Sequence, residues 1–312
     1  MSNKLVEFPY IHLQIDLRCE SSGRMPKHKT SMIRGIVGRI LKKHVCHDFK
    51  LACRECERNN ACVYSALFES PEHLVKKLNI GGTVPHPYIL RCHDTKTFFS
   101  VGNILTFEII ILGQSADTLA AYLLHVIEEL DRYSFGKDRL IFRVNSVYQL
   151  MNEDKKVIFD QKQMVKLEIS YFQMEMKKYD KVMIKLLTPC RIIRKGKTIR
   201  QFSIEEFLWQ VHHRAWQLYI LNNLWTSDFR PYEFLPLLDE KSITVIDEEW
   251  GEIPRYSTRQ KQTILLGGFK ATVELQRTEE LDQWLPLLLF GEKFHVGKAT
   301  TFGLGQYELW FR

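Results

Sequence analysis

The stretch PYIHLQIDLR, from Pro9 to Arg18, sets the pattern from which the fold of this chain is predicted. Its apolar residues stand at every second position, which is the period of a half-buried β-strand. A basic block follows directly, and an apolar stripe of helical period begins after Thr30 and Ser31. Either hydroxyl can cap a helix. The sequence therefore predicts a strand, a basic loop and a helix, in that order.

Both halves of the chain repeat this order. The first half continues with predicted strands at 88–92 and 104–112, a helix at 116–130 and a strand at 140–147. In the second half, Ser203 and Glu206 have the spacing of a capping box for a helix that runs to about Asn222. The other elements predicted for the second half are strands at 182–188, 242–246, 268–275 and 306–311, and a short helix at 281–289.

Each half thus reads β-α-β-β-α-β, which is the ferredoxin-like arrangement. A chain of 312 residues is long enough for two domains. We therefore predict an α+β protein with two tandem ferredoxin-like (RRM-like) domains, residues 1–155 and 156–312, joined at about 152–163. The first domain carries a small four-cysteine insertion at 46–62, and the second carries a C-terminal glycine-rich loop at 295–305.

The positive charge of the chain is concentrated in two blocks. The formal net charge is +7, yet Ser21–His47 and Lys181–Ile204 each contain seven Lys or Arg and no acidic residue. The two blocks sum to +14, so the rest of the chain carries −7. Two acid-free basic blocks in an otherwise acidic chain indicate an extended polyanionic partner. The alternative is a pair of solvated basic faces without a partner.

The sequence also limits the compartment. No stretch approaches the roughly 18 apolar residues of a membrane span. The first ten residues lack the apolar core of a signal peptide. We expect a cytoplasmic protein without a membrane partner, in which the seven cysteines are thiols or metal ligands rather than disulfides.

Three glycines near the C-terminus, Gly297, Gly303 and Gly305, surround a lysine and two threonines. Glycine allows positive φ angles, so successive N–H groups of such a loop can point into one concavity and hold an anion. A P-loop is excluded because its Gly-Lys pair closes the glycine run, whereas Gly297-Lys298 opens this one. A dinucleotide fingerprint is excluded because a predicted strand, not a helix, follows the loop. The loop is then an anion cradle or a simple glycine-rich turn.

Four cysteines lie within 17 residues, spaced as Cys46-x6-Cys53-x2-Cys56-x5-Cys62. The Cys-x2-Cys pair suits two corners of a tetrahedral metal site. Four thiolates around zinc would fasten a polar loop that cannot bury a core of its own. The spacing therefore predicts a structural zinc, with an iron–sulfur cluster or reduced thiols as the alternatives.

Four segments carry a likeness to a known family: GEKFHVGKATTFGLGQYEL (291–309), RYSTRQKQTILLGG (255–268), TPCRI (188–192) and MPKHKTSMIRGIVGRIL (25–41). In these segments and in their order, the chain resembles the CRISPR-associated endoribonucleases of the RAMP superfamily, in a form with a cysteine cluster. Enzymes of this family cut precursor crRNA within its repeats. The resemblance implies two ferredoxin-like domains with RNA lying along a basic cleft.

The chemistry that the resemblance implies needs neither a metal nor a cofactor. The ribose 2′-hydroxyl attacks the neighbouring phosphate, which leaves a 2′,3′-cyclic phosphate and a 5′-hydroxyl. The position that matches the family's proton-transfer residue is His28, and Lys29 is expected to stabilise the charged phosphorane. Histidine suits proton transfer because its pKa lies near neutrality. The alternative histidines are His44, His47, His212 and His213.

Repeat RNA is the expected partner, other CRISPR effector subunits are further candidates, and no nucleotide cofactor is expected. The alternative functions are a catalytically inactive RAMP subunit that grips repeat RNA in an effector complex, and a zinc-dependent scaffold without an RNA role. The residues expected to bind RNA are Arg24, Lys27, Arg34, Arg191, Arg194, Arg255, Arg259, Gln260, Gly297, Lys298, Gly303 and Gly305.

Overall fold

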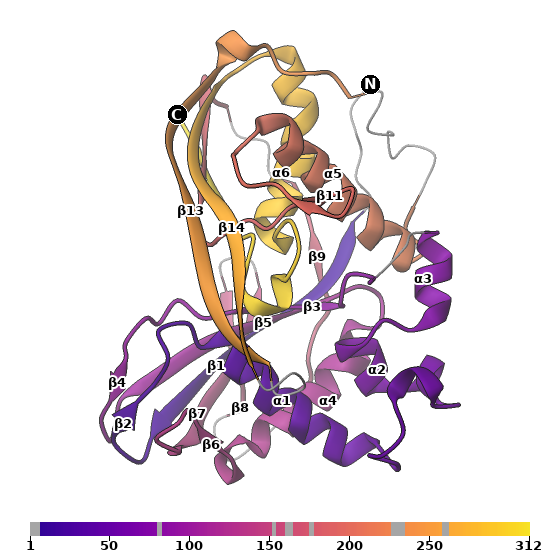
Figure 1. The fold of residues 1–312 in the computed structure, drawn as a ribbon, viewed down its shortest axis with the longest axis vertical. Helices are drawn as coiled ribbons and strands as arrows, with labels where there is room; N and C mark the ends of the chain where they lie inside the picture. The colour runs from indigo at the N-terminus through magenta and orange to yellow at the C-terminus, as the bar shows by residue number, and fades with distance from the viewer. Residues whose placement is uncertain are drawn as a thin grey trace. The chain divides into compact units, whose positions relative to one another are not determined.

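The computed structural model describes residues 7–79, 83–151, 154–159, 165–174, 178–225, 235–257 and 262–312. The chain forms two compact units (Figure 1). The N-terminal unit comprises Pro9–Tyr171, and the C-terminal unit comprises Phe172–Arg312 together with Met1–Phe8.

The N-terminal unit is built on an antiparallel sheet. Strand β1 (Phe8–Cys19) lies between β5 (Ile104–Leu112) and β7 (Leu140–Met151), and β3 (Tyr88–Arg91) pairs with the far side of β5. Helix α1 (Thr30–Val45) follows β1, helix α4 (Ala116–Glu128) follows β5, and the two helices pack against each other. The spatial order β3-β5-β1-β7 is the ferredoxin-like one, so the predicted arrangement of this half is confirmed.

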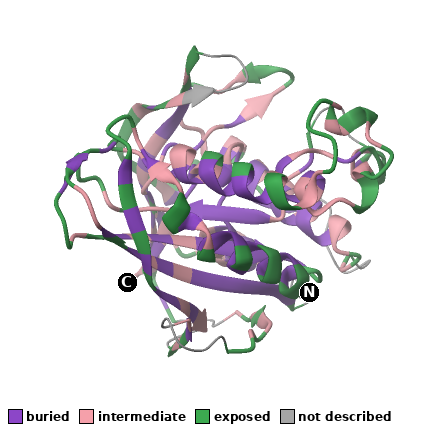
Figure 2. Ribbon diagram, turned by 90° about the horizontal axis from the view of Figure 1, so that it is seen from below, coloured by how far each residue is buried: buried purple, intermediate pink, exposed green. Residues whose placement is uncertain are grey.

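The hydrophobic periodicity explains why these residues fold in this way. Every second side chain of β1 from Ile11 to Cys19 lies in one hydrophobic core, and the apolar stripe of α1 from Ile33 to Leu41 faces the same core. Gly38 allows α1 to approach α2 (Val63–Phe68), because a Cβ at this position would lie 2.9 Å from the Phe68 ring. Figure 2 shows buried residues along the strands and on one side of the helices, with exposed residues on the other side.

Several short elements complete the N-terminal unit. Strand β8 (Asp154–Phe159) pairs with β7, so part of the stretch expected to join the halves belongs to this sheet. The division between the units therefore falls after Tyr171 rather than after residue 155. The remaining elements are β2 (Gly23–Arg24), β4 (Phe98–Phe99), β6 (Ser134–Phe135), β9 (Ser170–Phe172), α3 (Glu72–Leu78) and single 3₁₀ turns at Cys53–Glu55, Asn59–Ala61 and Leu130–Arg132.

The C-terminal unit repeats the arrangement. Strand β10 (Lys181–Leu186) lies between β14 (Gln262–Gln276) and β15 (Tyr307–Phe311), and β13 (Ile243–Ser257) pairs with the far side of β14. Helix α5 (Ile204–Leu221) packs against α6 (Glu279–Phe294). The order β13-β14-β10-β15 confirms a second ferredoxin-like half. The short elements are β11 (Ile193–Arg194), β12 (Lys197–Thr198) and 3₁₀ turns at Glu240–Ser242 and Thr300–Phe302.

Strands β13 and β14 are much longer than the sequence predicts. Their ladder runs from Ile243 opposite Leu275 to Ser257 opposite Gln262, and the two strands form the long ribbon in Figure 1. The prediction stopped short because Pro254 and the glycines of this stretch disfavour a strand interior. Pro254 is tolerated because β13 is the edge strand of this sheet.

The helix ends differ in how well they were predicted. The Ser203 hydroxyl accepts a hydrogen bond from the Glu206 N–H, as the capping box requires. Helix α1, in contrast, begins at Thr30 with Lys29 in the cap position and no side-chain cap, so the predicted caps at Thr30 or Ser31 are wrong. Helix α6 continues past Pro286 to Phe294, well beyond its predicted end. Among the described residues, no helix is long and apolar enough to cross a membrane.

Candidate nucleic-acid interface

The glycine loop (295–305) of the C-terminal unit is docked on the segment that follows β10. The Lys298 N–H donates to the Arg191 carbonyl at 2.8 Å, and the Gly305 N–H donates to the Pro189 carbonyl at 3.0 Å. Gly297 has φ +79°, and a Cβ there would lie 2.6 Å from the Arg191 carbonyl oxygen. Glycine is therefore required at this position for both its conformation and its close approach to the neighbouring backbone.

Several N–H groups of the loop are already used within the fold. Besides Lys298 and Gly305, the N–H groups of Phe302, Gly303 and Leu304 donate to carbonyl oxygens of the loop itself. An N–H group that already donates to a carbonyl cannot also hold a phosphate at full strength. These N–H groups shape the loop, and the expected RNA contacts of Gly297, Gly303 and Gly305 stay a prediction.

Positive side chains gather beside this loop. Lys298 lies close to Arg214 of α5, and both burial and the charge of Arg214 lower the pKa of Lys298. Arg214 is only 3% exposed, and burial lowers its pKa to about 10. Its Nη2 atom lies 3.4 Å from the Thr300 hydroxyl, while its Nε atom has no hydrogen-bond partner among the described residues.

The charge of this group is not balanced. Within the part of the chain that the structure describes, no carboxylate lies within 4.0 Å of Arg214 or Lys298. Arg194 adds a further positive charge, although Glu206 lies 3.5 Å from it. A buried cation without a counter-ion carries a large desolvation cost, which a bound anion would relieve. We call Arg194, His213, Arg214 and Lys298 the cation cluster.

An aromatic column runs along the same helix. Trp209, His213 and Trp216 are spaced one turn apart on α5, and all three are half-buried. The His213 ring stacks on Trp209 at 4.7 Å and on Trp216 at 5.5 Å between centroids. The Arg194 guanidinium lies 4.0 Å from the centre of the Trp209 ring. Such columns of aromatic and guanidinium planes are surfaces on which unpaired nucleobases stack.

His213 is held in its neutral form. Burial and then the charges of Lys298, His212 and Arg194 lower its pKa to about 4. At neutral pH the imidazole therefore contributes a flat, uncharged ring to the aromatic column. The positive charge of the cation cluster comes from its arginines and its lysine.

The remaining residues expected to bind RNA in this unit are placed differently. The Arg191 side chain donates to the Gly267 carbonyl at 2.9 Å and so helps to tie the docking segment to β14. The Arg255 guanidinium lies 4.3 Å from the centre of the Phe302 ring, at the glycine loop. Arg259 and Gln260 lie outside the described residues.

His28 of the N-terminal unit lies in the segment that leads into α1. It is half-buried, and burial followed by the charges of Lys27 and Lys29 lowers its pKa. The imidazole is therefore neutral at neutral pH and able to accept a proton. Arg24 and Lys27, in the same segment, are exposed. Arg34 instead packs its guanidinium over the Phe68 ring, 5.0 Å from its centre.

Lys29 is fully buried, although the sequence suggested a role at the phosphorane. Its ammonium donates to the carbonyl oxygens of Asp94 at 2.8 Å and Lys96 at 2.7 Å, and lies 3.5 Å from the Asp94 carboxylate. A side chain with no exposed surface cannot reach a phosphate in this arrangement. We therefore assign Lys29 a structural role, which is to tie the start of α1 to the 94–96 segment.

The four cysteines of the insertion, Cys46, Cys53, Cys56 and Cys62, line one cavity of about 400 Å³, together with Tyr122 of α4. The two 3₁₀ turns of the insertion bury none of their residues. Burial is the main cause of the raised pKa of Cys53, and the neighbouring Cys46 and Cys62 thiols add to it. The four sulfur atoms nevertheless do not meet at coordination distance within the described chain.

The alternative histidines lie in three different environments. His44 forms an ion pair with Glu129 at 2.9 Å, His212 is buried, and His47 is exposed beside the cysteines. Sequence reasoning missed Arg214 and the two tryptophans of the column. The signal for Arg214 was present, because Gln210, Arg214 and Gln217 form a polar row of helical spacing next to the apolar stripe of α5.

Two family models match the chain. One is described as the N-terminal domain of AF_1859 and matches residues 8–170, and the other is described as CRISPR-associated endoribonuclease Cas6 and matches residues 184–307. No curated protein matches the sequence. The two family models together cover both units.

Solved structures resemble the whole chain. A Cas6 in a product complex has a TM-score of 0.53 and 14% identity, and the match covers 98% of this chain and 100% of that one. The Thermus thermophilus Cas6 has the same TM-score and 13% identity, with 98% and 99% covered. A partial Cas6-RT-Cas1–Cas2 complex also scores 0.53, with 12% identity and 98% of this chain covered. This chain spans only 46% of that complex's chain, and identities this low establish a shared fold.

Proposed function

Because the chain belongs to the CRISPR-associated processing endoribonucleases of RAMP type, we propose that it matures crRNA by cutting precursor RNA within the CRISPR repeats. The observation that carries this proposal is a pair of neighbouring cations, Lys298 and the buried Arg214, that have no carboxylate within 4.0 Å among the described residues and lie beside an aromatic column. A phosphate on the half-buried Lys298 would supply negative charge next to Arg214, while bases stack on Trp209, His213 and Trp216. A single-stranded polyribonucleotide offers both groups in one molecule.

The proposed chemistry is an attack of the ribose 2′-hydroxyl on the adjacent phosphate, without a metal. His28 accepts the 2′ proton, since its half-buried position and lowered pKa keep the ring neutral. The bond from phosphorus to the 5′-oxygen then breaks, and the leaving oxygen keeps the electron pair and takes a proton from solvent. The products are a 2′,3′-cyclic phosphate and a 5′-hydroxyl. With Lys29 buried, the exposed Lys27 is the nearest cation in sequence that could stabilise the phosphorane.

The partners follow from the same reasoning. Repeat RNA is the proposed substrate, and the chain is proposed to work in the cytoplasm, where further CRISPR subunits could bind it. The chain resembles one segment of a Cas6-RT-Cas1–Cas2 complex over less than half of that complex's chain.

We further propose that zinc is held by Cys46, Cys53, Cys56 and Cys62. Support comes from the four thiols that share one cavity and from the insertion's lack of buried residues in its 3₁₀ turns. A bound zinc would supply a cross-link in place of a core. These residues fit the metal by number and type, and an iron–sulfur cluster would use the same ligands.

The zinc proposal predicts that Cys53→Ser combined with Cys56→Ser removes bound metal and lowers the melting temperature. The loss of a structural zinc site removes a large part of the local folding free energy. Metal analysis and thermal unfolding of the full chain would check this. The proposal would be contradicted if the wild type contained no metal and the double variant melted at the same temperature as the wild type.

The processing activity is tested by incubating the full chain with repeat RNA in EDTA and identifying the product ends. We expect cutting at one position, with a 2′,3′-cyclic phosphate on the upstream fragment. If the protein binds repeat RNA tightly but never cuts it, the alternative of an inactive RAMP subunit holds. If RNA binding is absent or insensitive to salt, neither RNA function holds, because phosphate contacts weaken steeply with salt.

A further inference from the structure

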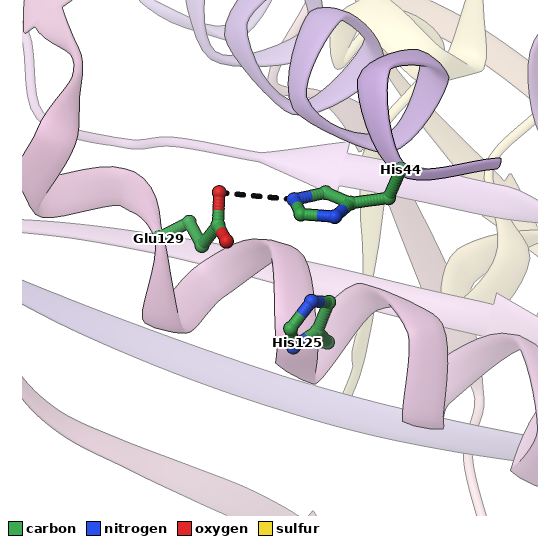
Figure 3. A group of neighbouring side chains, drawn as sticks. All are labelled: His44, His125 and Glu129. Carbon is green, nitrogen blue, oxygen red and sulfur yellow. Dashed lines mark ion pairs between the residues drawn. The ribbon is translucent and has the colours of Figure 1, made fainter. Parts of the chain in front are cut away.

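Three side chains that the proposed function does not use converge from two helices of the N-terminal unit. His44 lies in the last turn of α1, and His125 and Glu129 lie one turn apart at the end of α4. Figure 3 shows the two imidazoles and the carboxylate gathered in one place. Their ligand atoms all lie within 4.8 Å of one another, and no other group of His, Cys, Asp and Glu in the described chain has this property.

The geometry is close to that of a metal site before the ligands close on the ion. His44 Nε2 lies 2.9 Å from Glu129 Oε2, and the ring centroids of His44 and His125 are 4.8 Å apart at an angle of 72°. Ligands placed about 2.0–2.2 Å from a tetrahedral zinc stand about 3.3 Å from one another. Small side-chain rotations would therefore bring all three ligands onto one ion.

Neighbouring residues orient the ligands as they do around bound metals. Glu128 Oε2 lies 3.7 Å from His125 Nδ1, which leaves the Nε2 atom of His125 for an ion. Arg132 Nη1 lies 3.2 Å from Glu129 Oε1, the carboxylate oxygen that does not face His44. Metal-bound histidines commonly donate their second nitrogen to a carboxylate, and metal-bound carboxylates are themselves hydrogen-bonded.

The ligand set selects the kind of ion. Imidazole nitrogens suit zinc, nickel, copper and cobalt, whereas magnesium and calcium take oxygen ligands. The Glu129 carboxylate supplies the one oxygen ligand of the group. The His44 side chain is 30% exposed and that of His125 is 56% exposed, so an ion can enter from solvent.

We propose that His44, His125 and Glu129 bind a divalent ion of the zinc class, with water in the fourth position, and that the ion fastens the end of α1 to the end of α4. Such an ion would also lie close to the four-cysteine insertion. Cys46 follows His44 by two residues, and Tyr122 lies on the same helix as His125, so both ends that the ion joins also line the cysteine cavity. The site uses no thiolate and is separate from the proposed cysteine site.

Cobalt(II) tests this proposal, because cobalt bound to thiolates shows a charge-transfer absorption that histidine and carboxylate ligands lack. The full chain is freed of metal with a chelator and titrated with Co²⁺, followed by displacement with Zn²⁺. We expect a component of bound cobalt without thiolate charge transfer. In His125→Ala and Glu129→Gln its dissociation constant should rise at least about tenfold. The thiolate component should stay unchanged in both variants.

Asp131→Asn is the matched control, since it removes an acid from the same end of α4 but lies outside the group. The control should bind cobalt like the wild type. Thermal unfolding of each metal-free variant checks its fold, and His44→Gln replaces any variant that fails to fold. Equal cobalt binding by the wild type and the folded ligand variants would overturn the proposal. So would a wild type whose bound cobalt shows thiolate absorption alone.

Discussion

Arg214 is buried in the C-terminal unit at a cost to stability. The residue is 3% exposed, its Nε atom has no hydrogen-bond partner in the part of the chain that the structure describes, and burial lowers its pKa to about 10. Such a group persists in a fold when binding requires it. We therefore expect Arg214 to lower the stability of the fold and to increase its affinity for RNA.

Arg214→Met should leave the free energy of unfolding unchanged or raise it by up to about 4 kcal/mol, because a well-packed apolar chain replaces an uncompensated buried charge. The affinity for repeat RNA should fall in the same variant. Denaturant unfolding and RNA titration at fixed salt would check both effects. Arg277→Met is the control, since Arg277 is exposed, paired with Asp282 and outside the cation cluster, and it should change neither quantity much. A destabilised Arg214→Met variant with normal RNA affinity would contradict this assignment.

His28→Ala should lower the rate of cutting by at least about 100-fold while the affinity for RNA stays nearly the same, because general-base catalysis typically contributes that much. In the wild type, a base must be deprotonated to work, so the rate should rise with pH through the pKa of His28. That pKa lies below the ordinary 6.5, so the rate should be flat above this value. Single-turnover cleavage as a function of pH measures both. The exposed His73, replaced by alanine, is the control, and retained cutting in His28→Ala would move the assignment to another histidine.

At the scale of elements, α5 and the glycine loop are expected to bind RNA in different ways. The aromatic column of α5 carries no charge at His213, whereas Lys298 contributes one positive charge. Stacking is independent of salt to first order, but each phosphate contact adds about one unit to the slope of log affinity against log salt. The two contributions can therefore be separated experimentally.

Trp216→Ala should cost about 1–3 kcal/mol of binding free energy and leave the salt slope unchanged. Lys298→Met should reduce the slope by about one. RNA titrations at several salt concentrations would check the pair. If the two variants change the slope equally, the column does not act by stacking.

The glycine loop also makes a prediction about stability. Gly297→Ala should destabilise the chain by at least about 2 kcal/mol, because alanine is strained at φ +79° and its Cβ would meet the Arg191 carbonyl. Gly35→Ala is the opposite case, since a Cβ there meets nothing within 4 Å and alanine favours the helix by about 1 kcal/mol. Thermal unfolding of both variants measures the contrast. A Gly297→Ala variant as stable as the wild type would show that the loop is not docked as described.

At the scale of the whole molecule, the sequence predicts the two ferredoxin-like halves because their periodicity is set by burial. Alternation in β1 and the helical stripe of α1 both reflect one buried face, so the sequence alone identifies them. The outer part of the β13–β14 ribbon escapes prediction because much of it is exposed and therefore lacks alternation. Pro254 and the glycines of this ribbon further weaken the strand signal in the sequence.

The site was predicted less completely than the fold. Spacing and resemblance pointed to His28, Lys298 and Arg194, but burial depends on contacts between segments far apart in the chain. The 94–96 segment covers Lys29, and the glycine loop lies against Arg214. No local pattern records such contacts, so Lys29 was expected at the substrate and Arg214 was overlooked.

The central claim, that this chain cuts RNA by attack of the 2′-hydroxyl without a metal, is tested most directly by one substitution in the substrate. Repeat RNA with a single 2′-deoxynucleotide at the scissile position is compared with all-ribose RNA, both in EDTA. The account predicts that the all-ribose RNA is cut and that the deoxy RNA binds equally well but stays intact. Cutting of the deoxy RNA, or loss of cutting of the ribose RNA in EDTA, would contradict it.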